Sequence, residues 1–144
     1  MKKYQKLHDG IYMGGADDVE DMVKNEKCDV IIDLRDEVSA PSTENPNLEY
    51  IHIPLIDGEQ TEDQDQSLKN AINTVIQASK EGKTVAFHCA AGRNRTGSVA
   101  IGTLISLGLF DTYEDAEKEA QRLRPEIIIK KPLKESLNRM FPKE

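Results

Sequence analysis

The sequence predicts an α/β fold in which a mainly parallel central sheet is flanked by helices. Short apolar runs bounded by glycine, proline or polar residues alternate along the chain with longer segments in which apolar residues recur every three or four positions. Strands that alternate with helices form βαβ units, and these build parallel sheets between helical layers. Since the sequence shows no internal repeat or linker, we expect one domain over residues 1–144.

Four segments have the pattern of β-strands. Residues 10–15 form a short apolar run closed by glycines, and residues 28–34 form a compact apolar run that is typical of a strand buried on both faces. Residues 48–53 alternate between apolar and polar side chains and end at Pro54, and residues 84–88 have an apolar centre. We expect these segments to form the sheet.

Five segments have the pattern of helices, because their apolar residues recur at positions that share one helix face. These segments are residues 16–26, 67–80, 98–107, 112–123 and 132–140. The 98–107 segment is apolar over most of its length and stops at Gly108, which predicts a buried helix. Residues 36–47 contain two prolines and are expected to form a loop.

The functional site is expected at one edge of this sheet, because ligands of such folds bind beyond the carboxyl ends of the strands. Three segments of the sequence follow predicted strands in this way. They are Leu34-Arg35, Pro54 to Asp57, and His88-Cys89. A strand, a loop punctuated by glycines and a buried helix follow one another at the last of these segments.

Charge and composition exclude several classes of protein. The formal net charge of -7 argues against a general binder of nucleic acid or of anionic membranes, since those need a basic face. No apolar run approaches the roughly 20 residues of a membrane-spanning helix. The basic start over residues 1–6 is not followed by the apolar stretch of a signal peptide. With two cysteines we expect no disulfide framework, and we expect a cytoplasmic, reducing setting.

The segment His88-Cys89-Ala90-Ala91-Gly92-Arg93-Asn94-Arg95-Thr96-Gly97 carries the chemistry. A loop that opens a helix can turn several backbone N–H groups inward and bind an anion, and Gly92 and Gly97 relieve the steric limits on such a turn. The side chain of Arg95 can turn back toward the loop and bind two phosphoryl oxygens through its planar guanidinium group. The same positive field favours the thiolate form of a cysteine. The spacing therefore predicts a nucleophilic cysteine beneath a tetrahedral oxyanion.

This segment resembles the signature His-Cys-x5-Arg-Ser/Thr of the cysteine-dependent protein tyrosine phosphatase superfamily, in its compact dual-specificity branch. Residues 10–15 are similar to an early strand of these enzymes, and Ile53 to Asp57 to their general-acid loop. Arg124-Pro125 resembles their late Arg-Pro segment. The tyrosine-specific branch uses a Trp-Pro-Asp acid loop in a much longer domain, so a chain of 144 residues without tryptophan does not fit that branch.

The resemblance implies a role for each matching residue. Cys89 would attack phosphorus and form a cysteinyl-phosphate intermediate. Arg95 would hold the equatorial oxygens together with backbone N–H groups, Thr96 would hydrogen-bond the departing thiolate, and His88 would brace the loop. Asp57 would protonate the leaving oxygen and then activate water. No metal or other cofactor is implied, because arginine and the backbone dipoles supply the positive field.

The expected phosphate-binding set is the loop itself. It consists of Ala90, Ala91, Gly92, Arg93, Asn94 and Arg95. For Arg93 two interpretations stay open: a solvated loop residue, or a residue at the pocket mouth that selects anionic substrates.

Asp57 has rivals, because five acidic residues fall between positions 57 and 65. Its place after a strand end and Pro54, together with the resemblance to the general-acid loop of the family, favours it over Glu59, Glu62 and Asp63.

Cys28 is expected to pack in the core. It begins a strand whereas Cys89 follows the carboxyl end of a parallel one, so about 20 Å separates them. A disulfide requires Cα atoms within about 7 Å.

The function we expect is a phosphomonoester hydrolase acting on phosphotyrosine, and also on phosphoserine and phosphothreonine, in protein substrates. Two alternatives share the mechanism. Arg93 matches one basic position of phosphoinositide phosphatases in the superfamily, and residues 94–97 resemble its RNA 5′-triphosphatases. Acidic charge and few aromatic residues argue against a long RNA path. An alternative of another class is a catalytically inactive phosphate-binding module.

Overall fold

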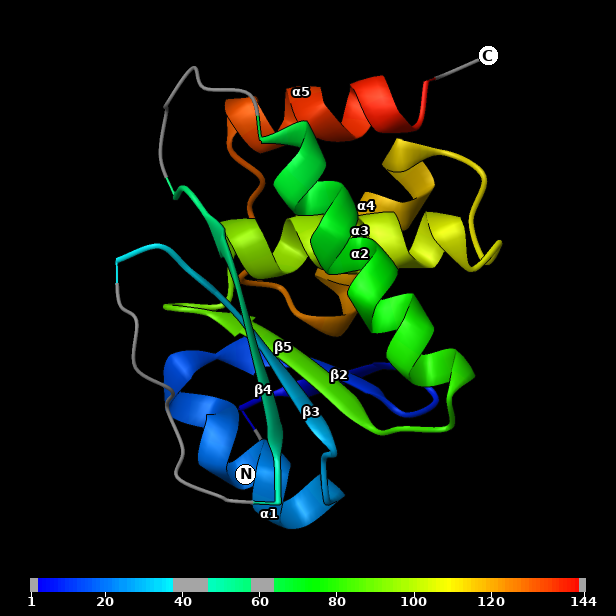
Figure 1. The fold of residues 1–144 in the computed structure, drawn as a ribbon. Helices are drawn as coiled ribbons and strands as arrows, with labels where there is room; N and C mark the ends of the chain where they lie inside the picture. Colours follow the sequence, from blue (N-terminus) through cyan, green and yellow to red (C-terminus); the bar gives the residue numbers. More distant parts are fainter. Residues whose placement is uncertain (1–2, 38–46, 58–63, 143–144) are drawn as a thin grey trace.

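The computed structural model describes residues 3–37, 47–57 and 64–142, and a twisted five-stranded sheet forms the centre of this part of the chain (Figure 1). The strands are β1 (Gln5–His8), β2 (Ile11–Gly15), β3 (Val30–Arg35), β4 (Glu49–Leu55) and β5 (Val85–Cys89). Their order across the sheet is β1-β2-β5-β3-β4, with β1 antiparallel to β2 and all other neighbours parallel. The predicted α/β fold with a mainly parallel sheet is confirmed.

Helices cover both faces of the sheet. A 3₁₀ turn, η1 (Ala16–Asp18), leads into α1 (Val19–Glu26), which lies on one face (Figure 1). The other face carries the remaining helices, among which α3 contacts both α2 and α4. They are α2 (Asp65–Lys80), α3 (Asn94–Ser106), α4 (Tyr113–Leu123) and α5 (Lys131–Met140).

Alternation along the central strands divides the core into two layers, because successive side chains of a strand point to opposite faces. Ile32 and Phe87 pack in the large cluster under α2 and α3, whereas their neighbours Ile31 and Ala86 pack in a smaller cluster beside α1. Cys28 belongs to this smaller cluster, and burial raises the pKa of its thiol to about 12. As predicted, Cys28 is a core residue and both cysteines are free.

The structure differs from the expected elements chiefly in three places. Strand β1 was not expected, because it is short and mostly polar; it pairs with β2 through Gly10 at φ 75°. Strand β4 runs through Pro54 instead of ending there, which an edge strand tolerates because proline need not donate to a neighbour. Helix α3 begins at Asn94 and not at Ser98, so Arg95 and Thr96 lie in its first turn.

The early start of α3 has a steric cause. The chain turns at Gly92, whose φ is 71°, so the loop is complete before Gly97. Gly97 lies within the helix, and a side chain there would clash, because a Cβ atom would be only 2.5 Å from Ile127. A glycine that serves close packing was interpreted from the sequence as a loop residue.

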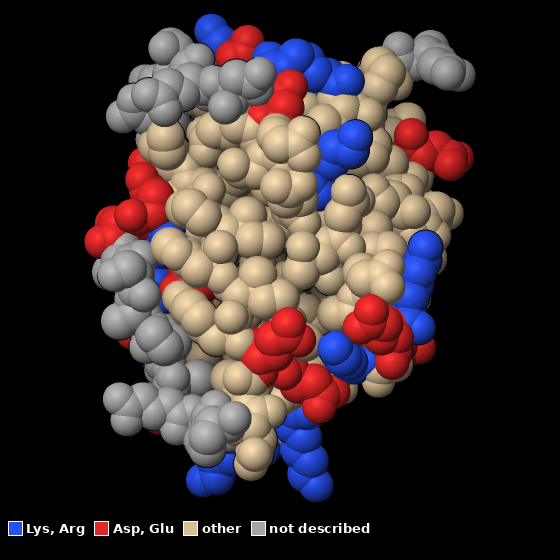
Figure 2. Space-filling model, in the orientation of Figure 1, with Lys and Arg blue, Asp and Glu red and all other residues tan. Residues whose placement is uncertain are grey.

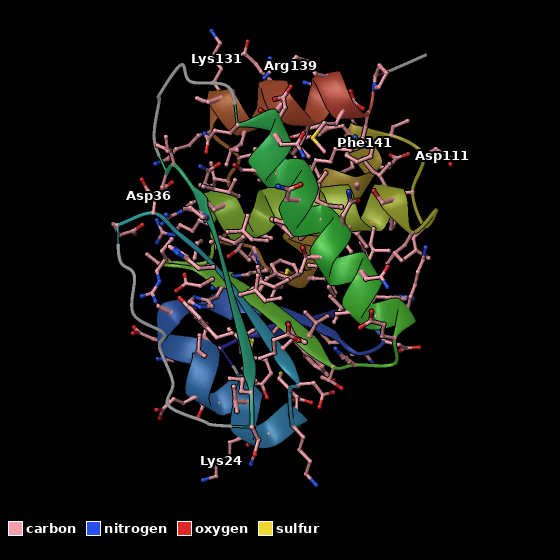
Figure 3. All side chains as sticks on the ribbon, in the orientation of Figure 1. Lys24, Asp36, Asp111, Lys131, Arg139 and Phe141 are labelled. Carbon is pink, nitrogen blue, oxygen red and sulfur yellow. The ribbon has the colours of Figure 1, made fainter. Side chains whose placement is uncertain are left out.

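The middle of the front face is mostly uncharged, and acidic groups lie along its left edge and across its lower part (Figure 2). Asp36, which follows β3, lies at this edge (Figure 3). No helix of the described ranges has the length and apolar character needed to cross a bilayer.

Candidate active site

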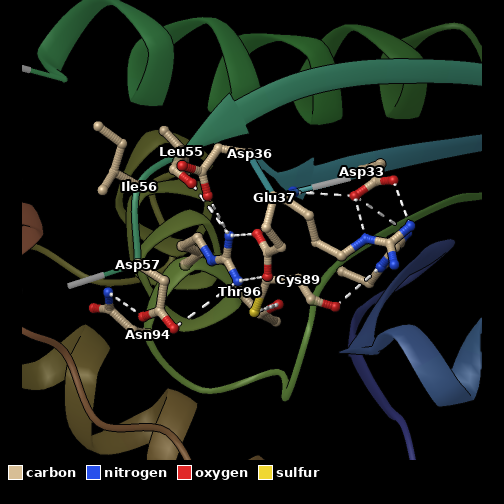
Figure 4. Close-up of polar contacts among 12 residues, drawn as sticks. Asp33, Asp36, Glu37, Leu55, Ile56, Asp57, Cys89, Asn94 and Thr96 are labelled. Carbon is tan, nitrogen blue, oxygen red and sulfur yellow. Dashed lines mark hydrogen bonds and ion pairs between the residues drawn. The ribbon is translucent and has the colours of Figure 1, made fainter. Parts of the chain in front are cut away.

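Cys89 is the last residue of β5, at the carboxyl edge of the sheet, and only 3% of it is exposed. The hydroxyl oxygen of Thr96, in the first turn of α3, lies 3.1 Å from Cys89 Sγ and 3.1 Å from the carbonyl oxygen of Gly14 (Figure 4). A hydroxyl carries a single proton, so it donates to one of the two at a time. The ionised form of the sulfur attracts that proton most strongly.

The loop of residues 90–93, hereafter the 90–93 loop, is held by its carbonyl groups. Ala90 O accepts a hydrogen bond of 3.0 Å from the Ala16 N–H group. Arg124 donates to the next two carbonyls, from Nη2 to Ala91 O at 3.2 Å and from Nε to Gly92 O at 2.7 Å. Three successive carbonyl groups of the loop are thereby fixed by η1 and by Arg124.

This arrangement orients the N–H groups of the 90–93 loop. In a trans peptide the N–H points opposite to the preceding carbonyl, so the Ala91 N–H group faces away from Ala16, and the Gly92 and Arg93 N–H groups face away from Arg124. The first intrahelical bond of α3 runs from Gly97 N to Arg93 O, which leaves the earlier N–H groups of the helix without an intrahelical partner. Loop and helix start together have the character of an anion-binding nest.

Arg124 was noted in the sequence only as part of an Arg-Pro resemblance. It is buried, and besides the loop carbonyls its guanidinium donates to Lys3 O and Gln5 Oε1, each at 2.7 Å. Asp18 lies 4.0 Å away. A buried guanidinium needs many acceptors, and here the 90–93 loop supplies two of them.

Gly92→Ala is expected to destabilise the fold and the 90–93 loop together. A Cβ atom at Gly92 would lie 2.5 Å from Arg124 Nη2 and 2.9 Å from both Gly14 C and Gly15 N. Gly82→Ala is the matched control, because Gly82 has φ 77° but open space around it. Urea unfolding should show a loss of about 1 kcal/mol for Gly82→Ala and about 3 kcal/mol for Gly92→Ala. Equal losses would contradict the packing argument.

Arg95 is 1% exposed and joins the ends of three elements. Its Nη1 and Nη2 atoms bond to the Glu37 carboxylate at 2.6 and 3.0 Å, and Nη1 also reaches Asp36 Oδ1 at 3.2 Å and Leu55 O at 3.3 Å (Figure 4). The bonds from Arg95 hold the pKa of Glu37 at about 2. Sequence reasoning missed Asp36 and Glu37, although their place directly after a buried strand could have pointed to them.

Asp57 lies beside Arg95, in the segment that follows β4. Its Oδ1 atom accepts a hydrogen bond of 3.2 Å from Asn94 Nδ2 and lies 3.2 Å from Lys130 Nζ, and its Oδ2 atom is 4.0 Å from Arg95 Nη2. Partial burial raises the pKa of Asp57, but the bonds from Asn94 and Lys130 and the charge of Arg95 outweigh it and leave the pKa below its ordinary value. The rival acids Glu59, Glu62 and Asp63 lie outside the described residues.

His88 is fully buried behind Cys89. Its Nδ1 atom is 3.1 Å from the Cys89 carbonyl oxygen, so this nitrogen carries a proton and donates. Burial lowers the pKa of His88 despite the carboxylate of Asp33, 3.8 Å from Nε2, and the ring is therefore neutral near pH 7. Asp33 is itself fixed by Arg35 and Tyr50, which donate to it at 2.8 and 2.6 Å.

The remaining loop residues are less constrained. Ala90, Ala91 and Arg93 are exposed, and Arg93 stands at the N-terminus of α3. This exposure is compatible with both interpretations of Arg93. The described ranges hold no group of three or more His, Cys, Asp or Glu side chains arranged to bind a metal ion.

A parallel sheet that ends in a cysteine, an anion-binding loop and a buried arginine is the arrangement of a cysteine-dependent phosphatase. The family model described as "Dual specificity phosphatase, catalytic domain" matches residues 11–141. The chain therefore belongs to the dual specificity phosphatase family.

Individual relatives are distant. Dual specificity protein phosphatase OPG106 of Vaccinia virus (strain Western Reserve) is 28% identical over 103 residues, which are 70% of this chain and 58% of the viral protein. Dual specificity protein phosphatase 12 of Rattus norvegicus is 26% identical over 84% of this chain and 36% of its own length. The chain thus spans little more than half of the first relative and about a third of the second.

Solved structures share the fold. DUSP15 superposes with a TM-score of 0.86 at 19% identity, over 99% of this chain and 89% of DUSP15. Human DUSP28 superposes with a TM-score of 0.83 at 15% identity, over 96% of this chain and 93% of DUSP28.

Proposed function

We propose that the protein is a phosphomonoester hydrolase that works through a cysteinyl-phosphate intermediate. Its proposed substrates are proteins that carry phosphotyrosine, and also phosphoserine and phosphothreonine, as its family membership suggests. The observation that supports the proposal is the contact between Thr96 and Cys89 beside a loop whose N–H groups face one side, with Arg95 and Asp57 at its edge. The proposed formation and hydrolysis of the cysteinyl-phosphate intermediate use no cofactor.

In the first step the Cys89 thiolate attacks phosphorus and the bond from phosphorus to the leaving oxygen breaks. The N–H groups of residues 90–95 and the Arg95 fork bind the equatorial oxygens, on which negative charge is spread. Asp57, in its protonated form, gives its proton to the leaving oxygen. Neutral His88 takes no part in the proton transfers and braces the carbonyl of Cys89.

In the second step a water molecule attacks phosphorus and the bond between sulfur and phosphorus breaks. The Asp57 carboxylate accepts the proton of this water, which restores the acid for the next cycle. The Thr96 hydroxyl, 3.1 Å from Sγ, donates to the departing thiolate and lowers the barrier to its release. Inorganic phosphate is the product.

Asp57 must hold a proton in the substrate complex although its pKa is below the ordinary value in the free protein. A phosphoryl dianion bound beside Arg95 places negative charge near Asp57. Like charges favour the neutral form of a carboxyl group, so substrate binding raises the pKa of Asp57. The acid is thus protonated when a leaving group is present.

We also propose that the protein acts in the cytoplasm. The mechanism needs Cys89 as a free thiolate, and a nucleophilic thiolate persists in a reducing compartment, whereas oxidising compartments convert such thiols to disulfides. Both cysteines of the chain are free.

The direct test is hydrolysis of p-nitrophenyl phosphate between pH 5 and 8. Turnover should be abolished by iodoacetate, and tungstate or phosphate should protect against this loss by occupying the nest. Phosphopeptides should then exceed phosphoinositides and 5′-phosphorylated RNA in kcat/KM. A protein that binds tungstate without turnover would be the inactive phosphate-binding module instead, and a preference for lipid or RNA would overturn the proposed substrate class.

Asp57→Asn is expected to lower kcat by about 10²- to 10³-fold and to remove the basic limb of the pH profile, because the amide cannot donate the required proton. The loss should be larger for phenyl phosphate than for p-nitrophenyl phosphate, whose leaving group needs less protonation. Asp111→Asn is the control, since Asp111 is exposed in the connection from α3 to α4, across the molecule from Asp36 (Figure 3).

The rival acids give this assignment a clear alternative. If Glu59→Gln, Glu62→Gln or Asp63→Asn removes the basic limb while Asp57→Asn keeps it, another carboxyl group is the acid.

A further inference from the structure

The connection between α4 and α5, residues 124–130, contacts the candidate site at both ends. Arg124 holds the 90–93 loop at the start of this connection. At its end the Lys130 N–H donates to Asn94 Oδ1 at 2.7 Å, and Asn94 Nδ2 donates to Asp57 Oδ1 at 3.2 Å. Lys130 Nζ lies 3.2 Å from the same oxygen. Lys130, Asn94 and Asp57 therefore close a ring of polar contacts, hereafter the Asp57 ring.

The Asp57 ring is rigid on its inner side. Asn94 is 3% exposed, and its amide can adopt one orientation only, because the flipped amide would set its oxygen against a carboxylate and its NH₂ group against an N–H. The connection is fixed by Ile127, which is buried and packs against Gly97. The backbone of Lys130 is thus held in place, and its side chain reaches the carboxylate from a fixed origin.

The outer side of the ring faces solvent, with 43% of the Lys130 side chain and 41% of the Asp57 side chain exposed. Arg95, the other cation near Asp57, is shared with Glu37 and Asp36. Within the described ranges, Lys130 is therefore the cation whose charge is directed chiefly at Asp57.

We propose that Lys130 is a positioning residue for Asp57, which holds the carboxyl group at the edge of the 90–93 loop and sets the upper pH limit of catalysis. This inference rests on the proposed role of Asp57 as the general acid. The ammonium group stabilises the carboxylate relative to the acid form, so it shifts loss of the catalytic proton to lower pH. The groups that act on Asp57 besides Lys130 are Arg95 and Asn94 of α3 and, through Arg95, Glu37, Asp36 and Cys89.

Lys130→Met is expected to move the basic limb of kcat, which reports the pKa of Asp57 in the substrate complex, upward by about 0.5 pH unit, the scale of a half-exposed ion pair. The variant keeps the backbone bond to Asn94, so it should fold. Lys130→Arg should restore the wild-type limb. Lys131→Met is the matched control, because Lys131 is the next residue and its side chain points away from the molecule (Figure 3). A limb that stays in place in Lys130→Met, or moves equally in Lys131→Met, would overturn the proposal.

A double-mutant cycle separates positioning from a general effect of charge. In the Asp57→Asn background, Lys130→Met should cause no further change in the pH dependence of kcat, because the carboxyl group through which it acts is gone. An undiminished effect in that background would mean that Lys130 acts elsewhere.

Failure of the proposed function gives a different result from failure of this inference. If the wild-type protein turns over no phosphate ester, the proposed function fails. The effect of Lys130 on Asp57 can then still be measured as the midpoint of a carbon-13 NMR titration of the Asp57 carboxyl group. In that experiment Lys130→Met should raise the midpoint by about 0.5 pH unit and Lys131→Met should not. An unchanged midpoint in Lys130→Met would refute the inference whether or not the protein is active.

Discussion

A Cys89→Ser variant is expected to lose turnover of p-nitrophenyl phosphate by about 10⁴-fold or more. A serine hydroxyl ionises far less readily than a thiol, and Thr96 alone cannot act as a base that removes its proton. The 90–93 loop and Arg95 are unchanged in this variant. It should therefore still bind tungstate with an affinity close to that of the wild type, as calorimetry would show.

Cys28→Ser is the matched control for this variant. Cys28 is buried in the smaller core cluster beside α1, with its sulfur 3.5 Å from the Met22 carbonyl oxygen. A serine there can keep that hydrogen bond, so kcat should stay within a factor of two or so. If Cys28→Ser abolished turnover and Cys89→Ser did not, the nucleophile would be misassigned.

Arg95→Lys is expected to lower kcat/KM by about 10³-fold, even though the charge is kept. The buried guanidinium binds Glu37, Asp36 and Leu55 through Nη1 and Nη2. Its Nε has no hydrogen-bond partner among the described residues, and Nε with the second proton of Nη2 can present two donors to a phosphoryl group. An ammonium group is a point charge that cannot do both. The Arg95→Lys variant should therefore bind tungstate weakly as well as turn over slowly, in contrast to Cys89→Ser.

Arg122→Lys is the matched control, because Arg122 makes a two-pronged pair with Glu119 at 2.7 and 2.8 Å on the exposed surface of α4. Surface pairs of this kind contribute little, so activity and stability should barely change. A similar loss of kcat/KM in both variants would show that the fork of Arg95 has no special part in catalysis.

The carboxylate that holds Arg95 should not itself limit activity between pH 5 and 8. The pKa of Glu37 is lowered to about 2 by its bonds to Arg95. A lowered pKa means that the pairing is complete above the ordinary glutamate value and is lost only as the pH falls toward 2. The acid limb of the pH profile is then expected to be the same in Glu37→Gln and the wild type.

Local chemistry explains which features could be predicted from the sequence. Cys89, Arg95 and Thr96 lie within one short segment, and a loop that binds an anion requires these residue types at this spacing whatever surrounds it. The apolar runs that become β3 and β5 are equally local, because burial on both faces leaves a continuous hydrophobic pattern. The position of Cys28 in the core followed from the same pattern.

Contacts between distant residues explain what could not be predicted. Glu37 and Arg95 are 58 residues apart, and Arg124 and Gly92 are 32 apart. In the sequence Glu37 differs from a surface charge only by its place after a buried strand, and Arg124 only by the Arg-Pro resemblance. The neighbours of Lys130 do not distinguish it from a surface charge at all. The glycines also suggested a later start for α3, because Gly97 was interpreted as a loop residue. Its role in the structure is to let Ile127 pack closely, and that tertiary contact is not visible in the sequence.

The sequence by itself determined the kind of chemistry: a strand, a cysteine, a loop that turns N–H groups inward and an arginine that closes it. Backbone geometry and side-chain type act over a few residues, so these features do not depend on the rest of the fold. Only the tertiary structure decided which groups hold that loop and the proposed acid, Asp57, in place. Arg124 binds the carbonyls of the 90–93 loop, Glu37 binds Arg95, and Lys130 contacts Asp57. These are hydrogen bonds and ion pairs of 2.6 to 3.2 Å between residues far apart in the chain, which arise once the sheet brings the strand ends together.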